Sequence, residues 1–144
     1  MTPHAVFERL VDGVTHGRWD ELPGLYAEDT VVTHPFAPAA AGPLRGREAL
    51  RRHFAAAAGL DLEMTARDVV VHTTADPEVV IGEFAYEGHV RATGRPFTIA
   101  NVFVLRVRDG LIVESRDYAD HLAFAAATGR LAALTGPANT TPSG

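Results

Sequence analysis

Residues 96–119, PFTIANVFVLRVRDGLIVESRDYA, determine the architecture that this sequence predicts. They form two stretches of alternating apolar residues that are joined only by Asp109-Gly110, a dipeptide typical of a tight hairpin turn. Two earlier stretches, 61–74 and 78–90, have the same strand-like period and are also separated by short turn signals. Long strands joined by short turns predict an antiparallel meander.

The residues ahead of this meander follow the period of helices instead. Thr2 and Pro3 are typical of a helix start, and Gly17 is typical of its end. The other expected elements are a short helix from Asp20, a short strand over 30–35, a helix over 47–58 and a last helix from Asp120 to about Leu134. We therefore expect one α+β domain over 1–134, a sheet wrapped around helices, followed by a disordered tail over 135–144.

Composition excludes several classes of chemistry. The chain has 144 residues, no cysteine, and a net charge of −5, and all 13 of its basic residues are arginine. Thiol nucleophiles, thiolate zinc sites and lysine Schiff bases are therefore impossible. Without a basic cluster, a long apolar run or a signal peptide, we expect no nucleic acid, no membrane and a cytoplasmic location. Acid–base chemistry without a cofactor is the class that remains.

Alternation along the final strand sorts its polar side chains. Asp117 shares a face with Leu111, Val113 and Ser115, and this face is predicted to point inward. Glu114 and Arg116 are predicted to pair on the outer face. Asp120 precedes a helical run and is expected to be its N-cap, and His121 is expected at the surface.

Asn101 and Tyr86 interrupt apolar inward rows on the two preceding strands. A buried amide without a hydrogen bond costs on the order of 1–3 kcal/mol, so Asn101 must bond neighbouring backbone, Asp117 or a ligand. Tyr86 either directs its hydroxyl into a cavity or is simply part of the core. The apolar residues expected to line the same pocket are Phe84, Ile99, Phe103, Val32 and Phe36.

His34 ends the short strand over 30–35 and shares the face of Val32. It lies next to a Pro/Ala/Gly loop, residues 36–42, which we expect to act as a mobile lid. A histidine at such a place lines the mouth of a cavity or has a structural hydrogen bond, and the pattern leaves both open. The spacing of the other histidines and acids predicts no metal site.

The order of four segments resembles the nuclear transport factor 2-like superfamily, which includes SnoaL-like polyketide cyclases, ketosteroid isomerases and limonene-type epoxide hydrolases. The segments are GRWDELPGLYAEDTVVTHP (17–35), LRGREALRRHF (44–54), TGRPF…NVFVLRVRDGLIV (93–113) and RDYADHL (116–122). The resemblance implies a cone-shaped fold, in which a curved antiparallel sheet wraps around N-terminal helices.

The resemblance also assigns roles to particular positions. His34 falls where ketosteroid isomerases carry the carboxylate that shuttles the proton, and Asp117 falls where the epoxide hydrolases carry one catalytic carboxylate. Phe84 and Tyr86 stand where the epoxide hydrolases have an arginine and a second aspartate. The water-activating device of those enzymes is therefore incomplete in this chain.

Together these patterns predict a cofactor-free acid–base enzyme: a cyclase, isomerase or dehydratase for a small, largely apolar molecule such as a polyketide-type intermediate. Asp117 is its expected acid/base, His34 its partner, and Asn101 and Tyr86 bind the developing oxyanion. The alternatives are a non-catalytic binding protein that uses the same pocket, and a dimerisation module whose pocket is filled by large side chains. The outward row of Thr98, Ala100, Val102 and Val104 predicts a homodimer.

Overall fold

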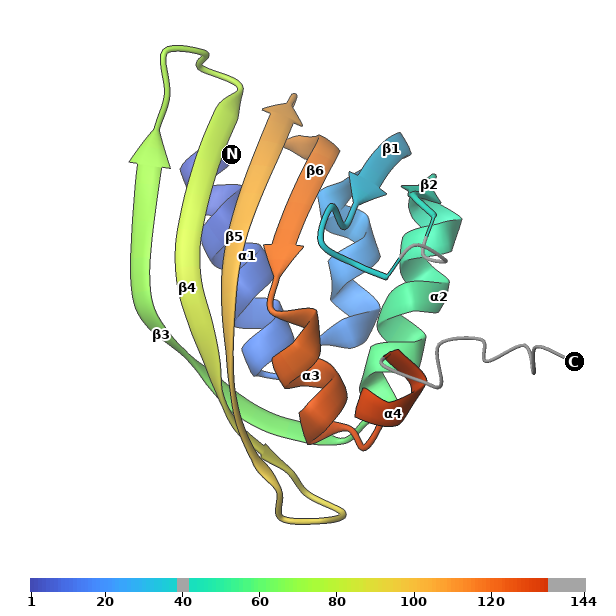
Figure 1. Cartoon of the computed structure of the whole chain (residues 1–144). Helices are drawn as coiled ribbons and strands as arrows, with labels where there is room; N and C mark the ends of the chain where they lie inside the picture. The colour runs from blue at the N-terminus through green and yellow to red at the C-terminus, as the bar shows by residue number, and fades with distance from the viewer. Residues whose placement is uncertain (39–41, 135–144) are drawn as a thin grey trace, which may run out of the picture.

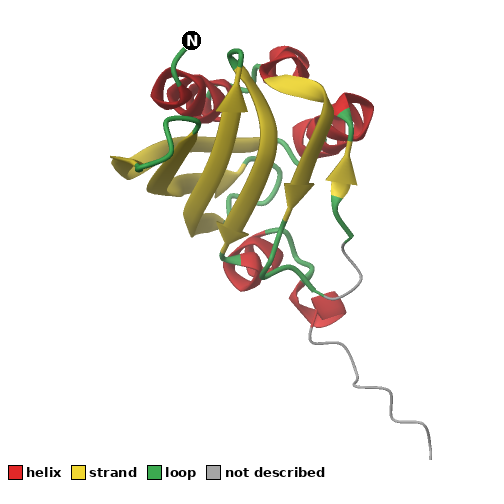
Figure 2. Cartoon of the chain, turned by 90° about the horizontal axis from the view of Figure 1, so that it is seen from above, coloured by secondary structure: helices red, strands yellow, loops and turns green. Residues whose placement is uncertain are grey.

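The computed structural model describes residues 1–38 and 42–134, which form one curved sheet with helices on its inner side and at one end (Figures 1 and 2). The helices are α1 (Pro3–Thr15), the 3₁₀ helix η1 (Trp19–Leu25), α2 (Arg47–Ala58), α3 (His121–Ala127) and α4 (Leu131–Leu134). The strands are β1 (Tyr26–Thr33), β2 (Leu44–Arg45), β3 (Leu62–Thr73), β4 (Val79–Val90), β5 (Pro96–Arg108) and β6 (Leu111–Ala119). No helix in the described ranges is long and apolar enough to cross a membrane.

The sheet has the strand order β2-β1-β6-β5-β4-β3. Strands β3 to β6 form the predicted antiparallel meander. The sheet as a whole is mixed rather than antiparallel, because β1 pairs in parallel with β6. This pairing also starts β1 at Tyr26, which aligns with Ile112, so the expected strand over 30–35 begins four residues earlier and ends at Thr33.

Helix α1 fills the centre of the cone. The Thr2 hydroxyl caps it by accepting a hydrogen bond from the Ala5 amide at 3.1 Å. Its apolar face packs across β3, β4 and β5 and buries Val6 and Phe7 completely. The Phe7 ring meets Phe84 of β4 edge-on, with ring centroids 5.7 Å apart. The sheet therefore curves around α1, and the apolar residues on the inner face of the sheet pack against this helix.

A bulge in β6 corrects one sequence prediction. Val107 pairs with Ile112 and Arg106 pairs with Glu114, so one extra residue of β6 lies between these two pairs. As a result Ile112 is fully buried, and not Leu111 or Val113 as simple alternation predicted. Beyond the bulge the predicted faces hold, because Ser115 is fully buried and Asp117 lines the interior cavity.

The chain turns back under the sheet after β6. Asp120 caps α3 as predicted, since its carboxylate accepts a hydrogen bond from the Ala123 amide at 2.9 Å. The single helix expected up to Leu134 is wrong: it divides into α3 and α4 at Gly129, whose φ of 73° does not fit a helix. The expected tail, 135–144, and residues 39–41 of the expected lid lie outside the described residues.

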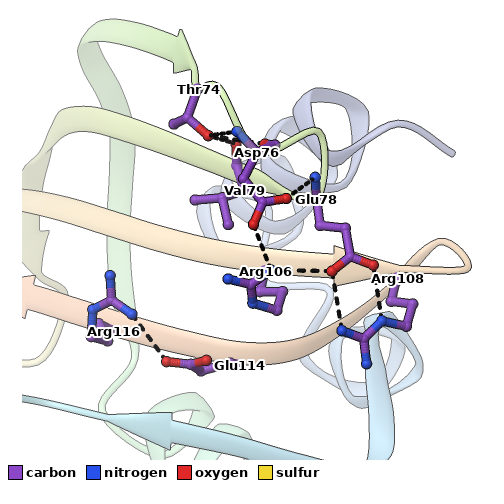
Figure 3. Close-up of polar contacts among 8 residues, drawn as sticks. All are labelled: Thr74, Asp76, Glu78, Val79, Arg106, Arg108, Glu114 and Arg116. Atoms are coloured by element: carbon purple, nitrogen blue, oxygen red, sulfur yellow. Dashed lines mark hydrogen bonds and ion pairs between the residues drawn. The ribbon is translucent and has the colours of Figure 1, made fainter.

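An ion cluster fixes the end of the meander opposite to α3 (Figure 3). Arg106 contacts Asp76 at 2.9 Å and Glu78 at 3.1 Å, and Arg108 contacts Glu78 at 2.9 Å. These bonds join the turn before β4 to the end of β5. The Glu78 backbone amide and then Arg106 lower the pKa of Asp76, and Arg108 and then Arg106 lower that of Glu78. They tie the start of β4 to the end of β5, at the end of this strand pair that no turn joins.

The outer face of the sheet is partly apolar. Glu114 and Arg116 pair there as predicted, at 3.0 Å (Figure 3). Beside them Ala100 is exposed, and Val102 and Val104 are half-buried. The homodimer that this row suggests stays a prediction.

We expect Gly82→Ala to destabilise the fold by about 1–3 kcal/mol, the usual cost of overpacking a core. A Cβ at this position would lie 2.1 Å from Cζ of the fully buried Phe7, which has no room to move away. Gly24→Ala is the matched control, because its Cβ would have no neighbour within 4 Å. Urea unfolding measures both, and equal stabilities of the two variants would contradict this packing.

Candidate active site

A cavity of about 400 Å³ lies between the inner face of the sheet and helices α1, α2 and α3. Its volume is within the range of small-molecule sites. Apolar side chains from every layer line most of it, among them Leu10, Trp19, Leu50, Phe54, Met64 and Phe124. The large side chains therefore surround a space rather than filling it.

Most residues predicted to line a pocket do so. Those on the wall of this cavity are Asp117, His34, Asn101, Tyr86, Ile99, Phe103 and Val32. Phe84 and Phe36 are not among them. Phe84 points inward as predicted but is covered by Phe7 of α1, whereas Phe36 is 69% exposed and packs against Tyr118 of β6. Phe36 is outside because the chain turns away from the sheet at Pro35, before the loop begins.

The parallel pairing of β1 with β6 brings His34 and Asp117 together. Thr33 aligns with Arg116, so the residues that follow them, His34 and Asp117, lie at the same end of the sheet. The distance between His34 Nε2 and Asp117 Oδ2 is 3.8 Å, longer than a direct hydrogen bond. Both side chains are largely buried, with 19% and 13% of their surfaces exposed.

The carboxyl group of Asp117 lies in surroundings that disfavour its charge. Burial in the apolar cavity raises the pKa of Asp117 from 3.8 to about 7. The buried Ser115 hydroxyl donates a hydrogen bond to Oδ1, which lowers this pKa and so offsets part of the effect. Asp117 is consequently divided between carboxyl and carboxylate near neutral pH.

His34 is shifted in the sense that keeps it neutral. Burial lowers its pKa to about 4, and the nearby His53 and His121 add to this effect. The His34 ring centroid lies 5.8 Å from that of His53 and 6.2 Å from that of His121. The contact with Asp117 has the geometry of a loose ion pair. At pH 7, however, desolvation favours a neutral His34 beside an Asp117 carboxyl group that is about half protonated.

His121 was expected at the surface, but it lines the cavity, and so does His53. His53 follows Leu50 by three residues on α2, so it shares the inward stripe with Phe54, and helical spacing could have identified it. His121 lies inside because α3 folds back across β5, which no local pattern shows. Its Nε2 is buried and has no hydrogen-bond partner within residues 1–38 and 42–134.

Asn101 resolves one of the open alternatives. Its amide nitrogen donates to the backbone oxygen of Ile99 at 2.9 Å, so backbone is its observed partner. Tyr86 differs, because its buried hydroxyl has no partner in the described parts of the chain. Burial and the charge of Asp117 both raise the pKa of Tyr86. Tyr86, a residue of the cavity wall, therefore stays protonated, and its hydroxyl has a hydrogen-bond donor that no described residue uses.

Tyr26 is a lining residue that the sequence patterns missed. It begins β1 and is almost completely buried. Burial raises its pKa, and Asp117 and Tyr86 contribute in the same direction, so all three groups lie close to one another. The polar end of the cavity thus contains two protonated tyrosines, one carboxyl group and neutral histidines.

Comparison with known proteins agrees with this architecture. The SnoaL-like domain matches residues 7–115, well over half of the chain. The chain belongs to the SnoaL-like family. It is 32% identical over 113 residues to an uncharacterized PhzA/B-like protein of Pseudomonas aeruginosa, 76% of each chain. It is 46% identical over 48 residues to the uncharacterized protein YesE of Bacillus subtilis, a match that covers only 33% of either protein.

Solved structures show the same fold. A Bacillus subtilis protein provisionally named an isomerase has a TM-score of 0.81 and 25% identity, with 90% of this SnoaL-like chain and 97% of that chain covered. A Xanthomonas campestris pv. campestris protein provisionally named a polyketide cyclase has a TM-score of 0.73 and 19% identity, with 88% and 96% covered. The curved sheet around helices is therefore the cone of the nuclear transport factor 2-like superfamily.

We expect the stability of Asp117→Asn relative to the wild type to be clearly greater at pH 8 than at pH 5. The pKa of Asp117 is about 7 in the folded chain and near 3.8 in the unfolded chain, so folding takes up a proton between these values. Wild-type stability therefore falls as the pH rises through this window. Above pH 7 the loss reaches at most about 4 kcal/mol, the equivalent of three pKa units.

Urea unfolding at the two pH values measures this difference. Every other titratable group is present in both proteins, so the difference reports on Asp117 together with its contact to His34. Glu114→Gln is the control, because Glu114 lies on the outer face and pairs with Arg116. A variant that is equally destabilised at both pH values would show that Asp117 is held as a stabilising carboxylate.

Proposed function

We propose that this SnoaL-like protein is a cofactor-free acid–base enzyme that isomerises, cyclises or dehydrates a small, largely apolar molecule. One observation carries the proposal: a carboxyl group with a pKa of about 7 lies inside an apolar cavity, 3.8 Å from a neutral imidazole. A group whose pKa is near the working pH can both accept and return a proton efficiently.

The geometry supports a simple order of events. The Asp117 carboxylate takes a proton from a carbon next to a carbonyl group of the substrate, and negative charge develops on the carbonyl oxygen. The free Tyr86 hydroxyl donates a hydrogen bond to that oxygen, in a cavity where such a bond is strong. The Asp117 carboxyl group then returns the proton to another carbon, which completes an isomerisation without a net change in atoms.

His34 has a supporting role in this proposal. Because its pKa is about 4, it is a neutral hydrogen-bond donor or acceptor rather than a cation. It can polarise a substrate oxygen next to Asp117 without fixing that group as a permanent carboxylate. Asn101 already bonds backbone through its amide nitrogen, so its part is to offer its amide oxygen to a ligand.

The names of similar structures agree with this class of chemistry, since they include an isomerase and a polyketide cyclase. The substrate and the catalysis are the proposed part. A homodimer across the outer face of β5 is part of the same proposal. Such an interface lies on the face of the sheet opposite to the cavity.

A Kemp elimination tests the proton-transfer step without knowledge of the natural substrate. In 5-nitrobenzisoxazole a base removes the ring C–H proton while the N–O bond breaks, and a coloured phenolate forms. We expect the protein to exceed acetate as a base by on the order of 100-fold, because Asp117 is positioned and desolvated. The rate should rise with pH through about 7, as the carboxylate forms.

Asp117→Asn should reduce this rate to that of the buffer, and Glu114→Gln should leave it unchanged. Glu114 lies on the same strand but on the outer face, so it reports on any effect of an ordinary surface carboxylate. A rate that survives in Asp117→Asn would remove Asp117 from the chemistry. A protein that only binds small molecules would take up the probe without this acceleration.

A further inference from the structure

The cavity contains one permanently charged side chain, and the acid–base proposal does not use it. Arg130 is the only arginine among the described residues that line the cavity. The other titratable groups on the wall are Asp117, two tyrosines and three histidines. Burial raises the pKa of both tyrosines and lowers the pKa of each histidine. Arg130 is therefore the group on this wall that keeps its charge at every pH, and that charge is positive.

The turn between α3 and α4 places Arg130. Gly129 takes a φ of 73°, and the Arg130 amide then donates to the Ala125 carbonyl at 2.7 Å, which closes the end of α3. The residue is exposed, and it shares the cavity with Ala56, Ala57 and Leu60 at the end of α2. Arg130 thus marks a solvent-accessible part of the wall, and the surfaces around it are apolar.

The guanidinium of Arg130 has no carboxylate partner among the described residues. Residues 39–41 and 135–144 contain no Asp or Glu. Most other arginines differ in this respect, as Arg106 and Arg108 do with Asp76 and Glu78 (Figure 3). Arg130 lines an apolar cavity without a carboxylate partner in residues 1–38 and 42–134, in a chain of net charge −5, and is therefore available to an anion from outside.

We propose that Arg130 binds a carboxylate of the substrate, so that the substrate is an apolar acid whose reacting end lies at Asp117. This proposal rests on the acid–base function for its reacting end, but the carboxylate site can be tested by binding alone. The planar guanidinium matches the two oxygens of a carboxylate. The apolar lining from Trp19 to Phe124 then holds the body of the molecule, and Arg130 fixes which end enters first.

The fluorescence of Trp19, the one tryptophan of the chain, reports binding because its side chain lines the cavity. The probes are 4-phenylbutyrate and its neutral isostere 4-phenylbutyramide, titrated at pH 6, where Asp117 is mostly protonated. We expect the carboxylate to bind about fivefold more tightly at low salt, as befits a partly exposed ion pair. This preference should shrink in 0.5 M NaCl, because salt screens such a pair.

Arg130→Gln should abolish the preference by weakening the binding of the carboxylate alone, with the affinity for the amide unchanged. Arg52→Gln is the matched control, since Arg52 is an exposed arginine of α2 that does not line the cavity. Equal binding of the two probes, or equal losses in the two variants, would overturn the proposal. Failure of both probes to bind at millimolar concentration would overturn it too.

Asp117→Asn separates this inference from the proposed function. The variant should keep the preference for the carboxylate, because it changes the reacting end and not the anchoring end. If the preference for the carboxylate is preserved but the wild type has no Kemp activity, the carboxylate site is supported and the acid–base function is contradicted. Kemp activity without a preference for the carboxylate would support the acid–base function and contradict the carboxylate site, so that the substrate would be uncharged.

Discussion

The removal of one carboxyl group from water is the constraint on which this site depends. Asp117 lies near the end of β6, where burial raises its pKa to about 7, and within the described parts of the chain the Ser115 hydroxyl is its one hydrogen-bond donor. A full ion pair with His34 would relieve that cost, but burial and two further histidines keep the imidazole neutral. The site therefore contains a carboxyl group that gains and loses its proton easily near neutral pH.

Several structural features combine to produce this environment. The bulge in β6 shifts the strand by one residue, so that Ile112 joins the core and Asp117 still reaches the cavity. The parallel pairing of β1 brings His34 to the same end of the sheet. Helix α3 then crosses β5 and adds His121, and the turn at its end adds Arg130. Residues that are far apart in the chain thus share one cavity.

Local patterns predicted the parts of this arrangement that depend on alternation and turns. Asn101, Tyr86 and Asp117 were placed on inner faces because strand geometry fixes every second side chain, and the bulge did not disturb that result. The environment of His121 depends on where α3 packs, and Phe84 is covered by a helix residue 77 positions earlier in the chain, Phe7. Such contacts are set by tertiary packing, so periodicity alone could not supply them.

A carbon-13 NMR titration of the aspartate carboxyl groups tests the central claim most directly. The signal of Asp117, assigned by its loss in Asp117→Asn, should titrate with a pKa of about 7 in the folded wild-type protein. In Ser115→Ala the pKa should be higher still, because the hydrogen bond that favours the carboxylate is gone. A pKa near 4 or below in the wild type would mean that Asp117 is an ordinary ionised carboxylate, and would contradict this account of the site.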